Sequence, residues 1–176
     1  AMQGWPEIIP TNVKIDYLQE LLRVGFHTLD FGSFVSPKAI PQMADTREVL
    51  ESLQWKMSKT RLLAIIANAR GAEEAASFEG VRYLGFPFSI SPTFQQKNTN
   101  STIAESFERV KDIQDICFAR GKEMVIYLSM AFGNPYNDPY DEEQVSVWAE
   151  KCHELGINII SLADTVGLAS LEQVHR

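Results

Sequence analysis

Cysteine is scarce in this chain of 176 residues, which contains only Cys117 and Cys152. Both fall at apolar positions of expected helices, which favours buried and reduced side chains. No disulfide framework is indicated, so we expect a protein of the reducing cytoplasm.

Clusters of basic residues and long apolar runs are lacking as well. The net charge is −7, so a nucleic-acid partner is not expected. No apolar run approaches the roughly 18 residues that a membrane-spanning helix needs, and no signal peptide is recognised. The sequence therefore indicates no membrane partner. It does contain 45% hydrophobic residues, enough for one domain with a real core.

The hydrophobic pattern alternates between strands and helices. Each expected strand precedes an expected helix and carries few charges, which is typical of parallel strands buried on both faces. A TIM (β/α)8 barrel and a doubly wound open sheet both fit this α/β pattern. The expected strands cover residues 26–31, 61–66, 81–88, 124–129 and 157–162. The expected helices cover residues 11–24, 46–57 and 71–78, and three more begin near residues 102, 141 and 170.

Several helix ends carry recognisable signals. Thr11 is expected to cap the first helix after Pro10, and Gly25 is expected to end it. Thr102 and Glu105 have the spacing of a capping box at the start of a later helix.

Polar side chains follow the expected strands at their carboxyl ends. Asp30 closes the first expected strand, and Pro37 and Pro41 stiffen the loop after it. In a barrel these strand ends share the rim that carries the active site, so the polar groups would converge. Each residue alone is more often a turn former or a helix cap, and the recurrence on one rim is the stronger signal. The rim candidates are Gln3, Asp30, Ser33, Ser36, Lys38, Asn68, Ser89, Ser91, Lys97, Asn98, Ser129, Asn134, Ser161, Asp164 and Thr165.

Histidine offers no metal site in this chain. His27, His153 and His175 are scattered, and no His-x-His pair is present. We therefore expect them to be structural or surface residues.

Four segments resemble the 3-hydroxy-3-methylglutaryl-CoA lyase family, which belongs to the metal-dependent TIM-barrel lyases and Claisen-type condensing enzymes. They read GFHTLDFGSFVSPKAIPQMAD, PTNVKIDYLQELLRVG, FQQKNTNSTIAESFERV and ISLADTVG. The resemblance implies that residues 1–176 form a single but incomplete catalytic barrel domain. It would cover the second to sixth strands of a TIM barrel, without the first, seventh and eighth.

The resemblance also implies an activity. Such an enzyme uses a divalent metal, Mg²⁺ or Mn²⁺, to cleave a 3-hydroxy-3-methylglutaryl-CoA-like thioester to acetyl-CoA and an oxo acid, acetoacetate. An acyl-CoA substrate and a homodimer are implied with it. The family's metal ligands have no counterpart in this chain. Two alternatives stay open: a Claisen-type condensing enzyme that joins acetyl-CoA to a 2-oxo acid, and a non-catalytic acyl-CoA-binding barrel.

Residue roles follow from the same resemblance. Asp30 matches an acidic residue, usually Glu, that pairs with a catalytic arginine, and Asp164 matches an acidic residue near the reacting groups. Both are expected to be catalytic. Asn134 stands where cysteine is common, which puts the identity of the acyl group in doubt. The positions expected to bind substrate are Gln3, Ser33, Ser36, Lys38, Asn68, Ser161 and Thr165.

Overall fold

A five-stranded parallel sheet organises the chain in the computed structural model, which describes residues 2–175. The strands lie in the order β1-β2-β3-β4-β5, so each one pairs with its neighbour in sequence. A doubly wound sheet would reverse this order at a switch point. The order therefore decides between the two expected folds and shows part of a β/α barrel. The strands are β1 (Thr28–Phe34), β2 (Arg61–Ile66), β3 (Val81–Ser89), β4 (Glu123–Ser129) and β5 (Ile159–Ala163).

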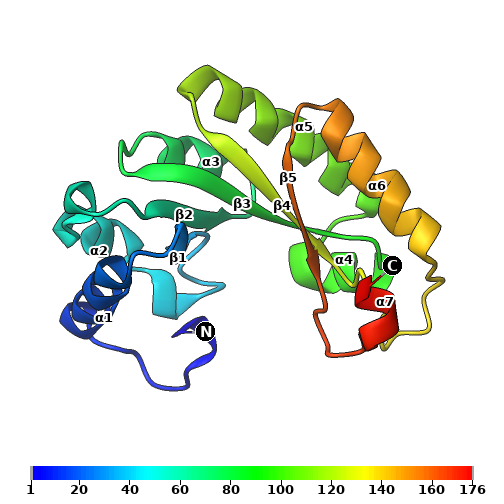
Figure 1. Ribbon diagram of the computed structural model, residues 1–176, viewed down its shortest axis with the longest axis horizontal. Coiled ribbons are helices and arrows are strands. Elements are labelled where there is room, and N and C mark those ends of the chain that lie inside the picture. The colour runs from blue at the N-terminus through cyan, green and yellow to red at the C-terminus, as the bar shows by residue number, and fades with distance from the viewer. Residues whose placement is uncertain (1, 176) are drawn as a thin grey trace.

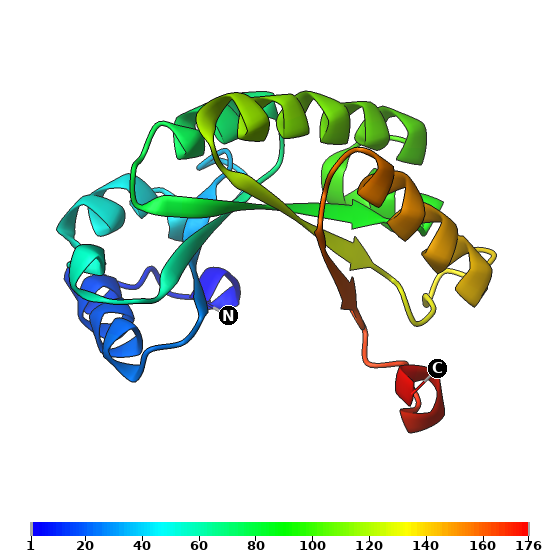
Figure 2. The ribbon, with the colours of Figure 1, turned by 45° about the horizontal axis from the view of Figure 1, so that its top comes forward.

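Most of the helices lie along the convex side of the curved sheet, whereas the last one lies beyond the end of β5 (Figures 1 and 2). None of the helices in residues 2–175 is both long and apolar enough to span a membrane. The α-helices are α1 (Thr11–Val24), α2 (Thr46–Ser52), α3 (Ala69–Ala76), α4 (Pro92–Thr99), α5 (Ile103–Arg120), α6 (Glu142–Glu154) and α7 (Leu171–His175). Three short 3-10 helices are η1 (Met2–Gly4), η2 (Pro41–Met43) and η3 (Trp55–Met57).

Alternation along the strands gives the sheet two different apolar faces. Residues of the convex face, such as Leu84, Phe86 and Ile126, are fully buried against the helices in the main core. The intervening residues form a second, smaller cluster on the concave face, where a barrel has its interior. That cluster contains Leu63, Tyr83 and Val125 together with the partly buried Ile65, Tyr127 and Ile159.

Several local predictions are confirmed. Helix α1 begins and ends where expected, and Gly25 follows it in the left-handed conformation with φ 81°. The capping box is complete: the Thr102 hydroxyl accepts from the Glu105 amide, and the Glu105 carboxylate accepts from the Thr102 amide at 2.7 Å.

Other local predictions are wrong. Thr11 is the first residue of α1 rather than its cap, because its hydroxyl donates to Asp45 Oδ2 at 2.8 Å. The second expected helix ends at Ser52, and η3 forms the remainder. Helix α4 was not expected, since its sequence is mostly polar without a clear apolar stripe. Its start is nevertheless encoded locally, because the Ser91 hydroxyl accepts from the Phe94 amide and Pro92 occupies the first turn.

Candidate active site

Asp30 lies in the middle of β1 rather than at its end, because the strand continues to Phe34. Its pairing with β2 shifts after Asp30, so that Asp30 lies opposite Leu63 and Gly32 lies opposite Ala64. Phe31 is the extra residue of this bulge, and its side chain packs into the convex core. The remainder of the strand is therefore displaced by one position.

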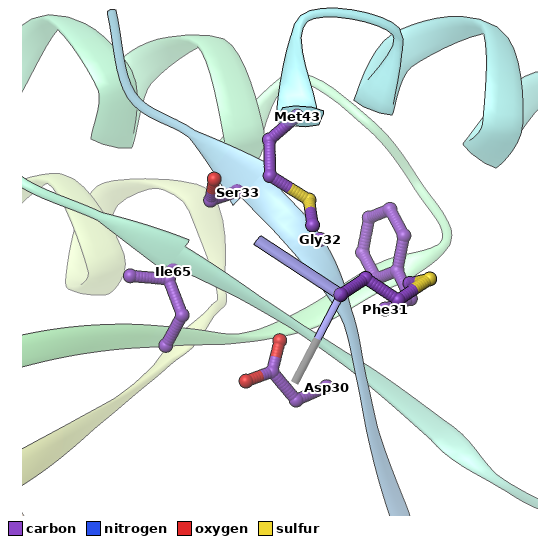
Figure 3. A pocket seen from close by; sticks show the side chains of 7 residues that line it. Asp30, Phe31, Gly32, Ser33, Met43 and Ile65 are labelled. Carbon is purple, nitrogen blue, oxygen red and sulfur yellow. The ribbon is translucent and has the colours of Figure 1, made fainter. Parts of the chain in front are cut away.

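The bulge brings two predicted site residues to one face. Residues three apart in a regular strand point to opposite faces. Ser33 nevertheless shares the concave face with Asp30, because it lies opposite Ile65, a member of the concave cluster. Figure 3 shows Asp30 and Ile65 on one side of the sheet, with Met43 reaching down toward Gly32.

Two hollows meet at Asp30. The smaller one measures about 70 Å³ and is lined by Asp30, Ser33, Met43 and neighbouring residues. The larger one measures about 570 Å³ and opens over the carboxyl ends of β1 to β4. Apart from Asp30, its lining is mostly apolar or aromatic, with two polar side chains from α4. These other lining residues are Val35, Ala39, Ile40, Ile65, Ile66, Ala67, Pro87, Asn98, Thr99 and Tyr127.

The environment of Asp30 changes its acidity. Burial raises the pKa of its carboxyl from 3.8 to about 6, although the hydrogen bond to the Gly32 main chain acts in the opposite direction. The residue as a whole is nevertheless exposed on the concave face. A carboxyl group with such a pKa exchanges its proton close to neutral pH, which is a property of catalytic acids and bases.

Tyr127 is a site residue that the sequence reasoning missed. It enters the larger hollow from β4 and lies in the concave cluster with Ile65. Burial and then the charge of Asp30 raise the pKa of its phenol. Gly85 makes room for the ring, since a Cβ at that position would lie 2.9 Å from Tyr127 Cε2. The alternation of β4 could have placed Tyr127 on the concave face, but not next to Asp30.

Ser33 carries the second polar group of the smaller hollow. The residue is 3% exposed, and its hydroxyl has no hydrogen-bond partner among the described residues. Leaving a buried hydroxyl unpaired is unfavourable by about 1–3 kcal/mol. A ligand atom that entered the hollow could provide the missing partner.

The predicted residues of the next two loops lie close to one another. Ser36 and Asn68 line a third hollow of about 160 Å³ at the end of β1 and β2. Asn68 caps α3, since its Oδ1 accepts from the Gly71 amide at 2.9 Å. Lys38 lies exposed in the same loop as Ser36. These three side chains are therefore at the predicted rim, with Asn68 already occupied as a cap.

The predicted residues in β5 and in the loop after it lie at the edge of the sheet opposite β1. Ser161 lies opposite Tyr127 and so faces the concave side. Thr165 accepts a hydrogen bond from the Met130 amide at 2.9 Å. The exposed Asp164 accepts from the Leu168 and Ala169 amides, and these bonds lower the pKa of its carboxyl. Within residues 2–175, Asp164 does not line either hollow at Asp30.

Gln3 belongs to η1, and its side chain lies outside the described residues. Its expected contact with substrate therefore stays a prediction.

The side chain of Asn134 forms hydrogen bonds with the main chain of its own loop. Its Oδ1 accepts from the Tyr136 and Asp138 amides, and its Nδ2 donates to the Asp138 carbonyl at 3.0 Å. Asp138 in turn accepts from the Ser91 hydroxyl and the Thr93 amide at the start of α4. These hydrogen bonds lower the pKa of Asp138. The Asn134 side chain therefore shapes the loop after β4.

Comparison with known proteins agrees with this architecture. The family model described as HMGL-like matches residues 2–176. The chain belongs to the HMGL-like family. It is 34% identical over 170 residues to the mitochondrial hydroxymethylglutaryl-CoA lyase of Mus musculus, covering 97% of this chain and 52% of that protein. It is 33% identical over 175 residues to hydroxymethylglutaryl-CoA lyase YngG of Bacillus subtilis, covering 99% and 58%. The HMGL-like chain thus spans about half the length of the curated relatives it matches.

Solved structures show the same arrangement of elements. An HMG-CoA lyase from Acinetobacter baumannii, in complex with coenzyme A and 3-methylmalate, superimposes with a TM-score of 0.91 at 32% identity. The alignment covers 98% of the HMGL-like chain and 56% of that one. The Bacillus subtilis HMG-CoA lyase gives a TM-score of 0.92 at 32% identity, covering 98% and 57%. The partial-barrel fold predicted from sequence is confirmed.

A metal site is not formed by the described part of the HMGL-like chain alone. Within residues 2–175, no group of three or more His, Cys, Asp or Glu side chains is placed to hold a metal ion. A hard divalent cation needs several oxygen ligands at once. The residues described do not by themselves fit the cation that the family resemblance implies.

Proposed function

We propose that β1–β5 of this chain form the second to sixth strands of an acyl-CoA lyase barrel. The substrate would be a 3-hydroxy-3-methylglutaryl-CoA-like thioester, and the products acetyl-CoA and acetoacetate. The observation that carries the proposal is the match to HMG-CoA lyases over 98% of the chain, including one that holds coenzyme A. The hollow at Asp30 supports it, because it lies at the rim where β/α barrels carry their active sites.

The chemistry of the proposed reaction suits this hollow. Cleavage removes the proton of the 3-hydroxyl group and breaks the C2–C3 bond, whose electrons form the enolate of acetyl-CoA. A proton then returns to C2. An apolar lining excludes water from the enolate, and the side chains of Val35, Ile40 and Ile65 supply such a lining.

We assign Asp30 the catalytic role at the floor of the hollow. With a pKa of about 6 it can hold or release a proton near neutral pH. An approaching cation, such as the arginine that the resemblance implies, would favour its ionised form. Ser33 would bind substrate through its unpaired hydroxyl. Asp164 remains a proposed catalytic residue, and the remaining proposed substrate contacts are Ser36, Lys38, Asn68, Ser161 and Thr165.

We also propose that the enzyme uses a divalent cation, Mg²⁺ or Mn²⁺. Its ligands would not be among the described residues. The predicted homodimer and the predicted cytoplasmic location stay predictions.

A cleavage assay on the complete gene product tests the proposal. It supplies 3-hydroxy-3-methylglutaryl-CoA with Mg²⁺ or Mn²⁺, includes an EDTA control and follows acetoacetate. Metal-dependent product is expected, with a large loss in Asp30→Asn and no loss in Asp115→Asn, which changes an exposed carboxylate on α5. Absence of product from folded, metal-loaded protein would contradict the proposal. Consumption of acetyl-CoA with a 2-oxo acid would support the condensing enzyme instead.

A further inference from the structure

A buried ion pair joins α1 to the segment that follows β1. Lys14 is 3% exposed, although it lies on a helix whose other buried residues are Leu18 and Leu22. Its ammonium group donates to Asp45 Oδ1 at 2.8 Å, to Asp45 Oδ2 at 3.0 Å and to the Gln42 carbonyl. The three donors of the lysine are thus directed at three acceptors.

Gln42 extends the same network to the residues before α1. Its side chain is 3% exposed; Nε2 donates to the Glu7 carbonyl at 2.8 Å, and Oε1 accepts from the Ile9 amide at 2.9 Å. Asp45 also accepts from the Thr11 hydroxyl. Two side chains of one loop therefore hold two stretches of chain that lie about thirty residues earlier in the sequence.

The stability of the fold does not by itself explain this network. Burying a charge is unfavourable, and replacing a buried ion pair with apolar side chains of similar size is often neutral or stabilising. Leu18 and Leu22 show that α1 packs well with apolar residues on this face. A network of this kind is better suited to fixing one conformation of the segment that it holds.

The segment it holds is the wall of the candidate site. Residues 35–45 contain no regular structure beyond η2, within the part of the chain described here. Val35, Ala39 and Ile40 nevertheless line the larger hollow, and Met43 lines the smaller one. Met43 is the neighbour of Gln42 in sequence, so a movement of Gln42 would carry Met43 with it.

We propose that Lys14, Gln42 and Asp45 are positioning residues that fix residues 35–45 around Asp30. The network touches neither hollow, and it acts through the placement of Met43, Ile40 and Val35. The catalytic part of this inference rests on the proposed lyase function, whereas the conformational part does not.

The test compares three variants of the complete gene product. Lys14→Met removes the charge and keeps the length of the side chain. The double variant Lys14→Met/Asp45→Leu replaces the ion pair with apolar packing. Lys56→Met is the matched control, because Lys56 forms an exposed ion pair with Glu79 at 2.9 Å away from the hollows. Three measurements are made on each variant: amide hydrogen exchange resolved by segment, the urea midpoint of unfolding, and kcat and KM for thioester cleavage.

Lys14→Met is expected to speed exchange in residues 35–45 while β3 and β4 stay protected. We expect kcat/KM to fall about 10²-fold, the loss that a misplacement of about 1 Å produces. The double variant is expected to regain the urea midpoint of the parent protein but neither the slow exchange nor the kcat. The control is expected to match the parent in all measurements.

A purely structural role would give a different result. Exchange would then rise throughout the protein in Lys14→Met, and activity would return together with stability in the double variant. Either result would overturn the inference. If Lys14→Met does not fold, the double variant alone decides the question by its exchange in residues 35–45 and its kcat. If the parent protein shows no cleavage, the proposed function fails, and the exchange of residues 35–45 still tests the positioning network.

Discussion

The ring of Tyr127 passes so close to Gly85 that a Cβ atom on this glycine would lie 2.9 Å from Tyr127 Cε2. The same atom would lie 2.8 Å from Ile65 Cδ1. Because Gly85 belongs to β3, between the strands of these two side chains, it allows them to meet over the middle of the sheet. The packing of Ile65 and Tyr127 at the floor of the larger hollow therefore requires that residue 85 has no side chain.

Gly85→Ala is expected to destabilise the protein by about 1–3 kcal/mol, the usual effect of adding a methyl group to a packed site. The urea midpoint of unfolding measures it. Gly4→Ala is the control, since a Cβ there would meet no atom within 4 Å, and its midpoint should stay close to that of the parent. Equal midpoints for the two variants would show that the Tyr127 ring moves freely.

Asp30 is expected to make the stability of the protein depend on pH. Its pKa is raised from 3.8 to about 6 in the folded state, so between these values the folded protein binds more protons than the unfolded one. Stability therefore falls as the pH rises through this range. Asp30→Asn should raise the urea midpoint at pH 7.5 but not at pH 3.5. Asp115→Asn serves as the control, and an equal effect at both pH values would contradict the raised pKa.

Ser33→Ala is expected to weaken substrate binding without lowering the stability of the protein. The Ser33 hydroxyl is buried and has no partner among the described residues, so its removal should leave the urea midpoint unchanged or raise it. If the hydroxyl binds substrate, KM for the thioester rises in the same variant. Ser106→Ala is a matched control, because it also removes a buried, unpartnered serine hydroxyl among the described residues and lies outside both hollows. A loss of stability in Ser33→Ala would indicate a partner that binds in the free protein.

Thr102→Ala should lower stability by about 1 kcal/mol, because it removes the cap of α5. The hydrogen bonds from Thr102 lower the pKa of Glu105, so their contribution is present above pH 4.5 and disappears as the pH falls through the lowered value. The difference between variant and parent should therefore shrink in acid. Ser146→Ala, on the exposed face of α6, should change little at any pH. A difference that does not depend on pH would contradict the hydrogen bond from the Thr102 hydroxyl to the Glu105 carboxylate.

Much of the fold could be predicted because its signals are local. The period of the apolar residues marked the five strands, and Gly25 and Thr102 marked helix ends. The order of the strands could not be predicted from the pattern, since barrels and doubly wound sheets share the same βα units. Helix α4 was missed because its signal lies in Ser91 and Pro92 rather than in a periodic stripe.

The candidate site was predicted only in part, because its geometry depends on contacts distant in sequence. Asp30 was recognised as a rim residue, but its meeting with Tyr127 requires three strand pairings in a definite register. The role of Gln42 and Asp45 could not be read from their loop. A lysine on the apolar face of α1 was the signal that could have predicted a buried partner for Lys14.

The bulge in β1 makes the register of its pairing with β2 a requirement in its own right. Phe31 is the residue without an opposite partner on β2, and because it is bulged out, Asp30 and Ser33 share a face although they lie three apart in sequence. A β1 of the same sequence with regular pairing would still contain both polar side chains, the loop and the hollow-lining aliphatic residues. It would turn Asp30 and Ser33 to opposite sides of the sheet. A comparison that scores only which residues are present would not distinguish the two pairings.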